Sequence, residues 1–291
     1  TTGTEAENTA TTNVVYDANA TDVDTVGSIT YSLTGTDASK FSIDGGTGEV
    51  RFIASPDFEA PTDAGTNNVY DIIVNANDGV NNATKAVAIS VTNVNDVAPV
   101  ISSGTTGTEA ENTATTNVVY TAAATDAEGN TITYSLTGAD AAKFSIGSAN
   151  GQVKFLASPN FEAPTDAGAN NVYDIIVNAN DGVNNTTKAV AISVTDVNDV
   201  TPTITSGTTG TEAENTATTN VVYTATATDA DTVGTLTYSL TGADATKFSI
   251  GSANGQVKFL ASPNFESPTD VGGNNVYDIT INVSDGSHTA T

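Results

Sequence analysis

Apolar and polar residues alternate with a period of two over many short stretches of the chain. The clearest run covers 131–136, where Ile132, Tyr134 and Leu136 alternate with Thr and Ser residues. The same pattern recurs over 70–76 and 87–91. Such alternation is typical of strands with one buried face, and the clusters of Gly, Asn and Asp between the runs indicate turns. No stretch has the periodicity of a helix, so the pattern predicts an all-β protein.

The alternating stretches recur because the chain is a tandem repeat. Residues 3–9, Gly-Thr-Glu-Ala-Glu-Asn-Thr, return at 107–113 and at 210–216. Tyr31 likewise corresponds to Tyr134 and Tyr238, at offsets of 103 and 104 residues. This period, with about seven strands in each repeat, predicts three tandem seven-stranded Greek-key β-sandwiches of immunoglobulin-like type. We place the three domains at 1–96, 97–199 and 200–291.

The first and the last repeat are shorter than the second. On alignment, the first lacks residues equivalent to 97–104, and the third lacks residues equivalent to 188–199. We therefore expect the third sandwich to lack its last strand. We also expect the chain to be part of a longer array of repeats.

Composition adds an acidic surface without disulfides. The chain has 34 acidic and 8 basic residues, a formal net charge of −26, and no Cys, Trp or Met. This charge excludes nucleic acid and anionic lipid as expected partners, because both need Lys and Arg to neutralise phosphate. No apolar run of about 18 residues is present, so we expect no direct insertion into a membrane. Without disulfides, stability has to come from packing, association or metal ions.

Acidic residues gather at the ends of the predicted strands, in an order that every repeat follows. In the first repeat the motifs are Glu7-Asn8, Ala20–Asp24, Thr47–Val50, Asp57–Glu59, Ala76–Asp78 and Asn93–Pro99. These motifs, in this order, resemble those of cadherin repeats, and the resemblance covers essentially the whole chain three times. It implies an extracellular, cell-surface protein without catalytic activity. It also implies that neighbouring repeats of the array are partners and bind Ca²⁺ between them.

Carried over residue by residue, the resemblance implies two sets of calcium ligands. The first set is Glu7, Asp57, Glu59, Asn93, Asn95, Asp96, Asp126, Glu128 and Asp181, with the backbone of Val94 and Val97. The second set is Glu111, Asn160, Glu162, Asp196, Asn198, Asp199, Asp229, Asp231 and Asp285. Incomplete sets remain at Asp22, Asp24 and Asp78 and at Glu214 and Glu266, and we expect these to bind calcium poorly.

Electrostatics alone, independently of the family resemblance, also favours a cation at each ligand set. Each set contains seven carboxylates and no Lys or Arg. Two carboxylates about 5 Å apart repel by roughly 3 kcal/mol at an effective dielectric constant of about 20, so seven together must be protonated or bound to cations. Oxygen ligands in this number favour calcium over magnesium, zinc and copper. Glu128 is longer than the Asp of the family pattern, and Asn93 and Asn160 replace Asp, so we expect altered or weaker binding there.

Four features admit other interpretations. The acidic runs could be solvated surface only. Tyr70, Tyr173 and Tyr277 could form a carbohydrate platform, but each continues the inward pattern of its strand, which favours a position in the core. Paired carboxylates of the ligand sets could serve a glycosidase, but no aromatic cleft accompanies them. His288 could be a catalyst, but it has no partner at motif spacing.

The leading hypothesis is a calcium-rigidified spacer or stalk of a large bacterial cell-surface adhesin or biofilm-matrix protein, which rests on the resemblance together with the Thr-, Asn- and Ala-rich surface and the absence of Cys. Near-identity of the repeats is typical of a spacer, and the chain has no Trp for adhesion by strand exchange. One alternative is a subunit of a self-assembling extracellular filament or surface layer, in which other copies of the chain are partners. The other is a calcium-dependent polysaccharide-binding module, which the absence of Trp disfavours.

Overall fold

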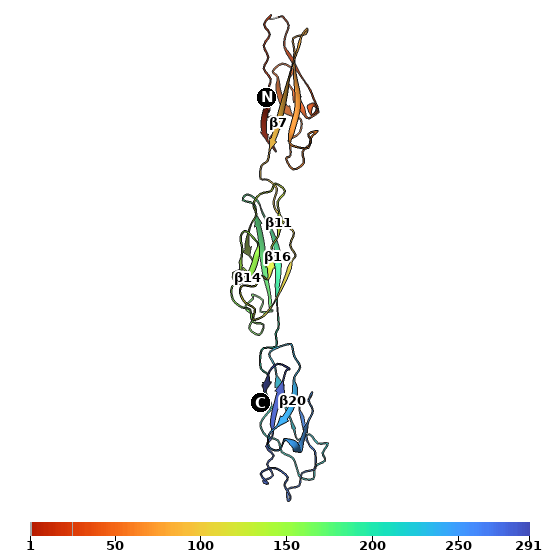
Figure 1. The fold of residues 1–291 in the computed structure, drawn as a ribbon, viewed down its shortest axis with the longest axis vertical. Helices are drawn as coiled ribbons and strands as arrows, with labels where there is room; N and C mark the ends of the chain where they lie inside the picture. The colour runs from red at the N-terminus through yellow and green to blue at the C-terminus, as the bar shows by residue number, and fades with distance from the viewer. Residues whose placement is uncertain (1, 25) are drawn as a thin grey trace. The chain divides into compact units, whose positions relative to one another are not determined.

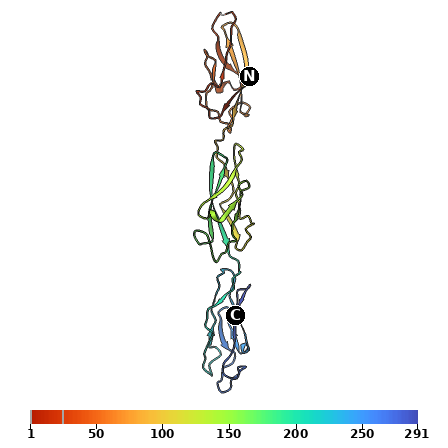
Figure 2. The ribbon, with the colours of Figure 1, turned by 90° about the vertical axis from the view of Figure 1, so that its left-hand side faces the viewer.

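The computed structural model describes residues 2–24 and 26–291. Strands and loops make up nearly all of this part of the chain (Figures 1 and 2), and its only helical segments are 3-10 turns of three residues each. The prediction of an all-β protein is therefore confirmed.

Each repeat supplies a similar series of elements. The first contains β1 (Thr2–Ala6), β2 (Tyr16–Asp17), β3 (Thr30–Thr34), η1 (Ala38–Lys40), β4 (Phe41–Ile43), β5 (Glu49–Phe52), β6 (Val69–Asn77) and β7 (Asn82–Thr92). The second contains β8 (Val100–Ile101), β9 (Thr106–Ala110), β10 (Tyr120–Thr121), β11 (Ala124–Thr125), β12 (Thr133–Thr137), η2 (Ala141–Lys143), β13 (Phe144–Ile146), β14 (Gln152–Phe155), β15 (Val172–Asn180) and β16 (Asn185–Thr195). The third contains β17 (Thr203–Ile204), β18 (Tyr223–Thr224), β19 (Ala227–Thr228), β20 (Thr237–Thr241), η3 (Ala245–Lys247), β21 (Phe248–Ile250), β22 (Gln256–Phe259), β23 (Thr280–Ser284) and β24 (Thr289–Ala290).

Packing divides the chain into two compact units. Unit 1 comprises Thr1–Ser102, Ala123–Tyr134 and Asn178–Thr187. Unit 2 comprises Ser103–Ala122, Ser135–Val177 and Lys188–Thr291. Segments of the second repeat thus belong to both units, and the repeat boundaries after residues 96 and 199 stay a prediction.

Two sheets enclose the core of the first repeat. β1, β7, β6 and β3 form one sheet in that order, and β2, β5 and β4 form the other. β1 runs parallel to β7, beside which it lies in Figure 1, whereas β7, β6 and β3 are antiparallel neighbours. A first strand that returns beside the last one gives the Greek-key order expected for the sandwich.

Aromatic rings fill the centre of each sandwich. The rings of Phe41 and Phe52 lie 4.4 Å apart, and Tyr70 meets both edge-on at 5.7 and 5.2 Å. Tyr70 is only 1% exposed, so its core position is confirmed and a carbohydrate platform there is excluded. The same three-ring arrangement recurs for Phe144, Phe155 and Tyr173 and for Phe248, Phe259 and Tyr277.

The third sandwich is completed only in part by its last strand. β24 has two residues, whereas β7 and β16 have eleven each. β1 and β9 pair in parallel with the far halves of β7 and β16. The identical sequence at 209–213 forms no strand, because the strand that would pair with it is missing from the sheet. A strand of two residues, β24, thus lies where the sequence predicted no last strand.

Buried Asp residues hold the long loop between β5 and β6, and the sequence reading did not single them out. Asp37, before η1, accepts hydrogen bonds from the N–H groups of Ala64 (2.7 Å) and Asp71 (2.8 Å). Asp63 accepts from the N–H groups of Asn67 and Asn68, both at 3.0 Å. The equivalent residues are Asp140 and Asp166 in the second repeat and Asp244 and Asp270 in the third. This loop carries Glu59, so the buried Asp residues fix one side of the candidate site.

Candidate metal centres

Glu7 connects three segments of the first repeat. It follows β1 and is 3% exposed, and Asn8 behind it has φ 57°, which turns the chain. Its Oε2 accepts the N–H of Phe58 at 2.8 Å, and its Oε1 accepts the N–H of Val94 at 2.7 Å. The carboxylate thus joins the β5–β6 loop to the segment after β7. Glu111 does the same with Phe161 and Val197.

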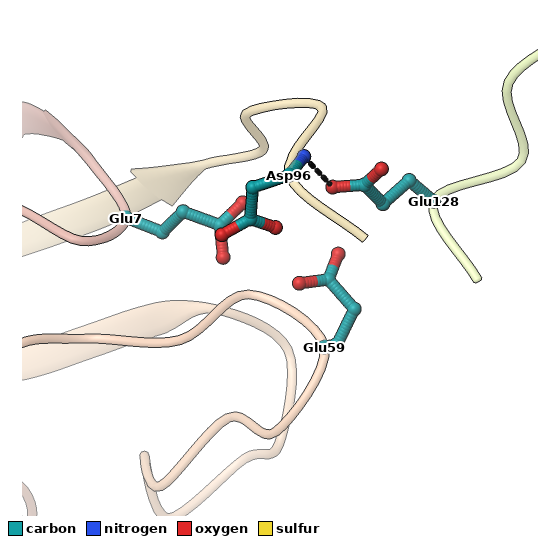
Figure 3. A group of neighbouring side chains, drawn as sticks. All are labelled: Glu7, Glu59, Asp96 and Glu128. Carbon is teal, nitrogen blue, oxygen red and sulfur yellow. Dashed lines mark hydrogen bonds between the residues drawn. The ribbon is translucent and has the colours of Figure 1, made fainter. Parts of the chain in front are cut away.

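A first group of carboxylates forms around Glu7 in unit 1. Oxygens of Glu7, Glu59, Asp96 and Glu128 all lie within 4.8 Å of one another (Figure 3). The N–H of Asp96 donates to Glu128 Oε1 at 2.8 Å, the bond drawn in Figure 3. The Arg51–Glu49 ion pair and the contact of His288 with Asp285 involve none of these four carboxylates.

Glu128 also belongs to a second group, with Asp126 and Asp181. Asn95 lies against it: its Oδ1 is 3.1 Å from both Glu128 Oε2 and Asp181 Oδ2. No hydrogen bond joins these three oxygens to one another unless the amide is turned so that its nitrogen donates to both carboxylates. We name the six carboxylates of the two groups, with Asn95, the first oxygen cluster.

A second oxygen cluster lies in unit 2 and comprises three groups. They are Glu111 with Glu162 and Asp196, Glu162 with Asp199 and Asp231, and Asp229 with Asp231 and Asp285. Asn198 adjoins them and donates from Nδ2 to the carbonyl of Asp285 at 3.3 Å. Here the N–H of Val200, not that of Asp199, donates to Asp231, at 2.8 Å. The shorter Asp side chain in place of Glu128 accounts for this shift of one residue.

Many oxygens of the two clusters are buried and lack a hydrogen-bond donor. In the first cluster they are Glu59 Oε1 and Asp126 Oδ2. In the second they are Glu162 Oε1 and Oε2, Asp196 Oδ1, Asn198 Oδ1, Asp229 Oδ2, Asp231 Oδ1 and Asp285 Oδ2. Buried acceptors in native proteins are nearly always paired. These oxygens therefore point to an electropositive occupant of each cluster.

Burial and neighbouring charges change the proton affinity of two Glu side chains. Burial, and then the charge of Glu7, raise the pKa of Glu59. Burial raises the pKa of Glu162 to about 7, and the charges of Glu111 and Asp231 add to the effect. Both shifts show that a negative charge at these positions is unfavourable when nothing positive compensates it.

Not every expected ligand joins a cluster. Asp57 and Asn160 are exposed and accept hydrogen bonds from Ala60 N–H and Ala163 N–H, which makes them turn residues. Asn93 is exposed directly after β7. The incomplete sets form no group of three acidic oxygens among the described residues. These sets include Asp22, Asp24, Asp78, Glu214 and Glu266.

Two amides contribute to the first cluster although the sequence reading did not name them. Asn130 donates to Glu128 Oε2 at 3.3 Å. Asn184 donates to Asn95 Oδ1 at 3.1 Å and to Asp181 Oδ2 at 3.4 Å. The only signal for either residue was its place in a loop next to a predicted ligand.

Comparisons with known proteins agree with the repeat pattern. No family model matches the sequence. An alignment over 288 residues with human Protocadherin Fat 1 has 30% identity. The match covers 94% of this chain and only 6% of that protein. Among the described residues, no helix is long and apolar enough to span a membrane.

Solved structures give the same result for the fold. The EC22–24 segment of mouse cadherin-23 matches with a TM-score of 0.79 and 26% identity, over 98% of this chain and 90% of that one. The EC1–3 segment of mouse protocadherin-24 matches with a TM-score of 0.72 and 22% identity, over 99% of this chain and 93% of that one. The chain therefore consists of cadherin-like tandem β-sandwich repeats.

Proposed function

We propose that the chain is a calcium-rigidified spacer of an extracellular array, without catalytic activity. The observation that carries the proposal is the set of buried oxygens without donors in both clusters. Each cluster includes the segment that follows a last strand, 93–99 or 196–202, together with carboxylates from two successive repeats. A cation there would limit bending of these linkers.

The donor set fits calcium. It consists of carboxylate and amide oxygens, without a thiol or a His ligand in either cluster, and calcium takes six to eight such oxygens at flexible geometry. Softer metals favour nitrogen and sulfur, and magnesium retains several waters. The first cluster would hold ions through Glu7, Glu59, Asp96, Asp126, Glu128, Asp181 and Asn95. The backbone of Val97, the turn residue Asp57 and the exposed Asn93 remain further candidates there. The second cluster would hold ions in the same way together with Asn198, and the turn residue Asn160 remains a further candidate.

We place the spacer in a large surface adhesin or biofilm-matrix protein, outside the cell. Millimolar calcium is common there, and extracellular calcium modules bind at roughly 10⁻⁴ to 10⁻³ M. The near-identity of the repeats and a Thr- and Asn-rich acidic surface support a spacer rather than a ligand-binding module. Neighbouring repeats of the same array are then the main partners.

Limited proteolysis tests the proposal. The full chain is digested by a protease that does not itself need calcium, in calcium and in a chelator, and cleavage within 93–99 and 196–202 is followed by mass spectrometry. We expect protection in calcium and rapid cleavage in the chelator. Replacing Asp126 and Asp229 by Asn should abolish the protection, whereas the matched replacement of the exposed Asp71 and Asp174 should not.

Equal cleavage of both linkers in calcium and in chelator would refute the proposal. The same samples distinguish the alternatives. Light scattering that shows calcium-dependent growth of assemblies would favour the filament or surface-layer subunit, and calcium-dependent binding on a glycan array would favour the polysaccharide-binding module.

A further inference from the structure

We infer that calcium fills the second oxygen cluster at a lower concentration than the first, so that the two linkers become ordered one after the other. The inference rests on the proposed calcium binding and concerns how this chain distributes it. It follows from three differences between the clusters: their charge, their internal hydrogen-bond donors and their unpaired oxygens.

The second cluster gathers more negative charge. Seven carboxylates lie in its three groups, against six in the two groups of the first cluster. The difference arises where Asp196 lies beside Glu111 and Glu162, since the equivalent residue in the first linker is Asn93, which is exposed. More carboxylates in a site of this kind raise its affinity for calcium.

The first cluster supplies its own donors. Asn130 donates to Glu128, and Asn184 donates to Asp181 and to Asn95. Alternatively, the Asn95 amide can turn, which gives up the bond from Asn184 and lets its nitrogen bond Glu128 and Asp181, both at 3.1 Å. A calcium ion must displace these protein donors, and hydrogen bonds to charged groups are the stronger ones to give up.

The second cluster has no equivalent of Asn130 or Asn184. Its own donors include the N–H and hydroxyl of Thr232, both of which donate to Asp196 Oδ2 and leave Asp196 Oδ1 without a donor. The loop at 229–234, Asp-Ala-Asp-Thr-Val-Gly, has no Asn at all. His288 stands in the place of Asn184, and its Nδ1 is buried without a hydrogen bond, 3.7 Å from Asp285 Oδ2.

The unpaired oxygens reflect this difference. Within the described part of the chain, seven buried oxygens of the second cluster lack a donor, against two of the first. Asp231 and Asp285, each more than nine-tenths buried, direct such oxygens into the cluster. Calcium entering there displaces no protein donor from these oxygens. The first cluster, by contrast, can remain ordered without calcium through its amides.

Hydrogen–deuterium exchange with mass spectrometry resolves the two linkers in the full chain. Peptides that cover 93–99 and 196–202 are followed while free calcium is raised in a chelator buffer. We expect two transitions, with half-protection of 196–202 at about tenfold lower calcium than that of 93–99, a spacing typical of sites that differ in ligand charge. In the chelator, 93–99 should exchange more slowly than 196–202.

Reciprocal variants move the transitions toward each other. Asn93→Asp should lower the calcium needed at 93–99, and Asp196→Asn should raise that needed at 196–202. Asn184→His and His288→Asn exchange the amide between the clusters and should shift the two transitions in opposite directions. Asp71→Asn, on the outer face of a sheet, serves as the control and should shift neither.

The outcomes separate this inference from the proposed function. Coincident transitions, or protection of 93–99 at the lower calcium concentration, would overturn the order of filling and leave calcium binding intact. Exchange that is insensitive to calcium at both linkers would overturn the proposed function itself.

Discussion

Buried carboxylates of two kinds occur among the residues of this chain. Asp37, Asp63 and Glu7 have both oxygens bonded to backbone N–H groups, so their charge is compensated by the fold. Asp231 and Asp285 are buried to the same extent, yet each retains an oxygen without a donor. In the first kind the fold satisfies both oxygens, and in the second kind it satisfies one oxygen and leaves the other for a cation.

Removing a carboxylate of the first kind should destabilise the fold whether or not calcium is present. Asp140→Ala leaves the N–H groups of Ala167 and Asp174 without acceptors. We expect a loss of about 2–4 kcal/mol in the free energy of unfolding, because each unsatisfied buried donor costs about 1–3 kcal/mol. Urea denaturation measures it, with the exposed Asp174→Ala as control. Equal stability of the two variants would contradict this role.

Acid should weaken the third repeat through Asp270. Hydrogen bonds from the N–H of Asn274, and then of Asn275, outweigh burial and hold the pKa of Asp270 below its ordinary value of 3.8. The folded state thus favours the ionised carboxylate, and its contribution is complete above the ordinary pKa and lost as pH falls through the lowered one.

Asp270→Asn should therefore lower stability at neutral pH and flatten its loss in acid. Urea midpoints of the variant and of the parent chain, measured from about pH 5 to about pH 2, should converge at the acid end. Parallel curves over that range would show that Asp270 does not cause the acid dependence. Asp278→Asn, at an exposed position, is the control.

At the scale of elements, the hairpins depend on a few backbone conformations. Gly151 lies between β13 and β14 with φ +66°, as the Asn-Gly turn signal predicts. A Cβ atom there would lie 2.3 Å from the carbonyl oxygen of Ala122, which is backbone and cannot move aside. Asn150 helps by accepting the N–H of Gln152 at 3.1 Å.

Gly151→Ala should therefore destabilise the β13–β14 hairpin. We expect a loss of about 1–3 kcal/mol from strain and steric overlap, measured by urea denaturation. Gly104→Ala is the matched control, since a Cβ there meets nothing within 4 Å. If both variants lose the same stability, the close approach to Ala122 is not the cause.

The alternating pattern predicted the strands well, because apolar side chains such as Tyr70 and Ile72 lie together on the one buried face of their strand. The motif order predicted which carboxylates gather around Glu7 and Asp231. It could not predict that Asp37 and Asp63 are internal acceptors, because an Asp in a Thr- and Gly-rich loop looks the same whether it caps a turn or faces solvent. The contact of Asn184 with Asn95 joins residues that are 89 positions apart, and no local pattern contains it, whereas Asn130 bonds Glu128 only two residues away, through a side-chain orientation that the sequence does not specify.

At the scale of the whole molecule, a net charge of −26 opposes compactness. Acidic side chains outnumber Lys and Arg by 34 to 8, so most of the repulsion is uncompensated within the protein. Salt screens this repulsion and bound calcium neutralises it. We therefore expect salt to stabilise the folded chain less when calcium is present.

Thermal unfolding at low and high NaCl tests this expectation. In chelator, raising NaCl from about 20 to about 500 mM should raise the Tm by several degrees, because the Debye length falls well below 10 Å. In calcium, the same change should have a smaller effect. A salt effect of equal size in both conditions would show that calcium does not neutralise the charges that oppose folding.

The parallel pair of β1 with β7 has a consequence for anyone who excises repeats for engineering. The five-residue sequence Thr-Gly-Thr-Glu-Ala is a strand at Thr2–Ala6 and at Thr106–Ala110, yet it is irregular at 209–213, where β24 is short. If a fragment ends before the far half of its last strand, its first strand has no partner and the neighbouring strand of the sheet has an unpaired edge. Strands of two such fragments can pair with each other's open edges and form swapped dimers. Moving the cut by about ten residues therefore decides whether the fragment stays monomeric or polymerises.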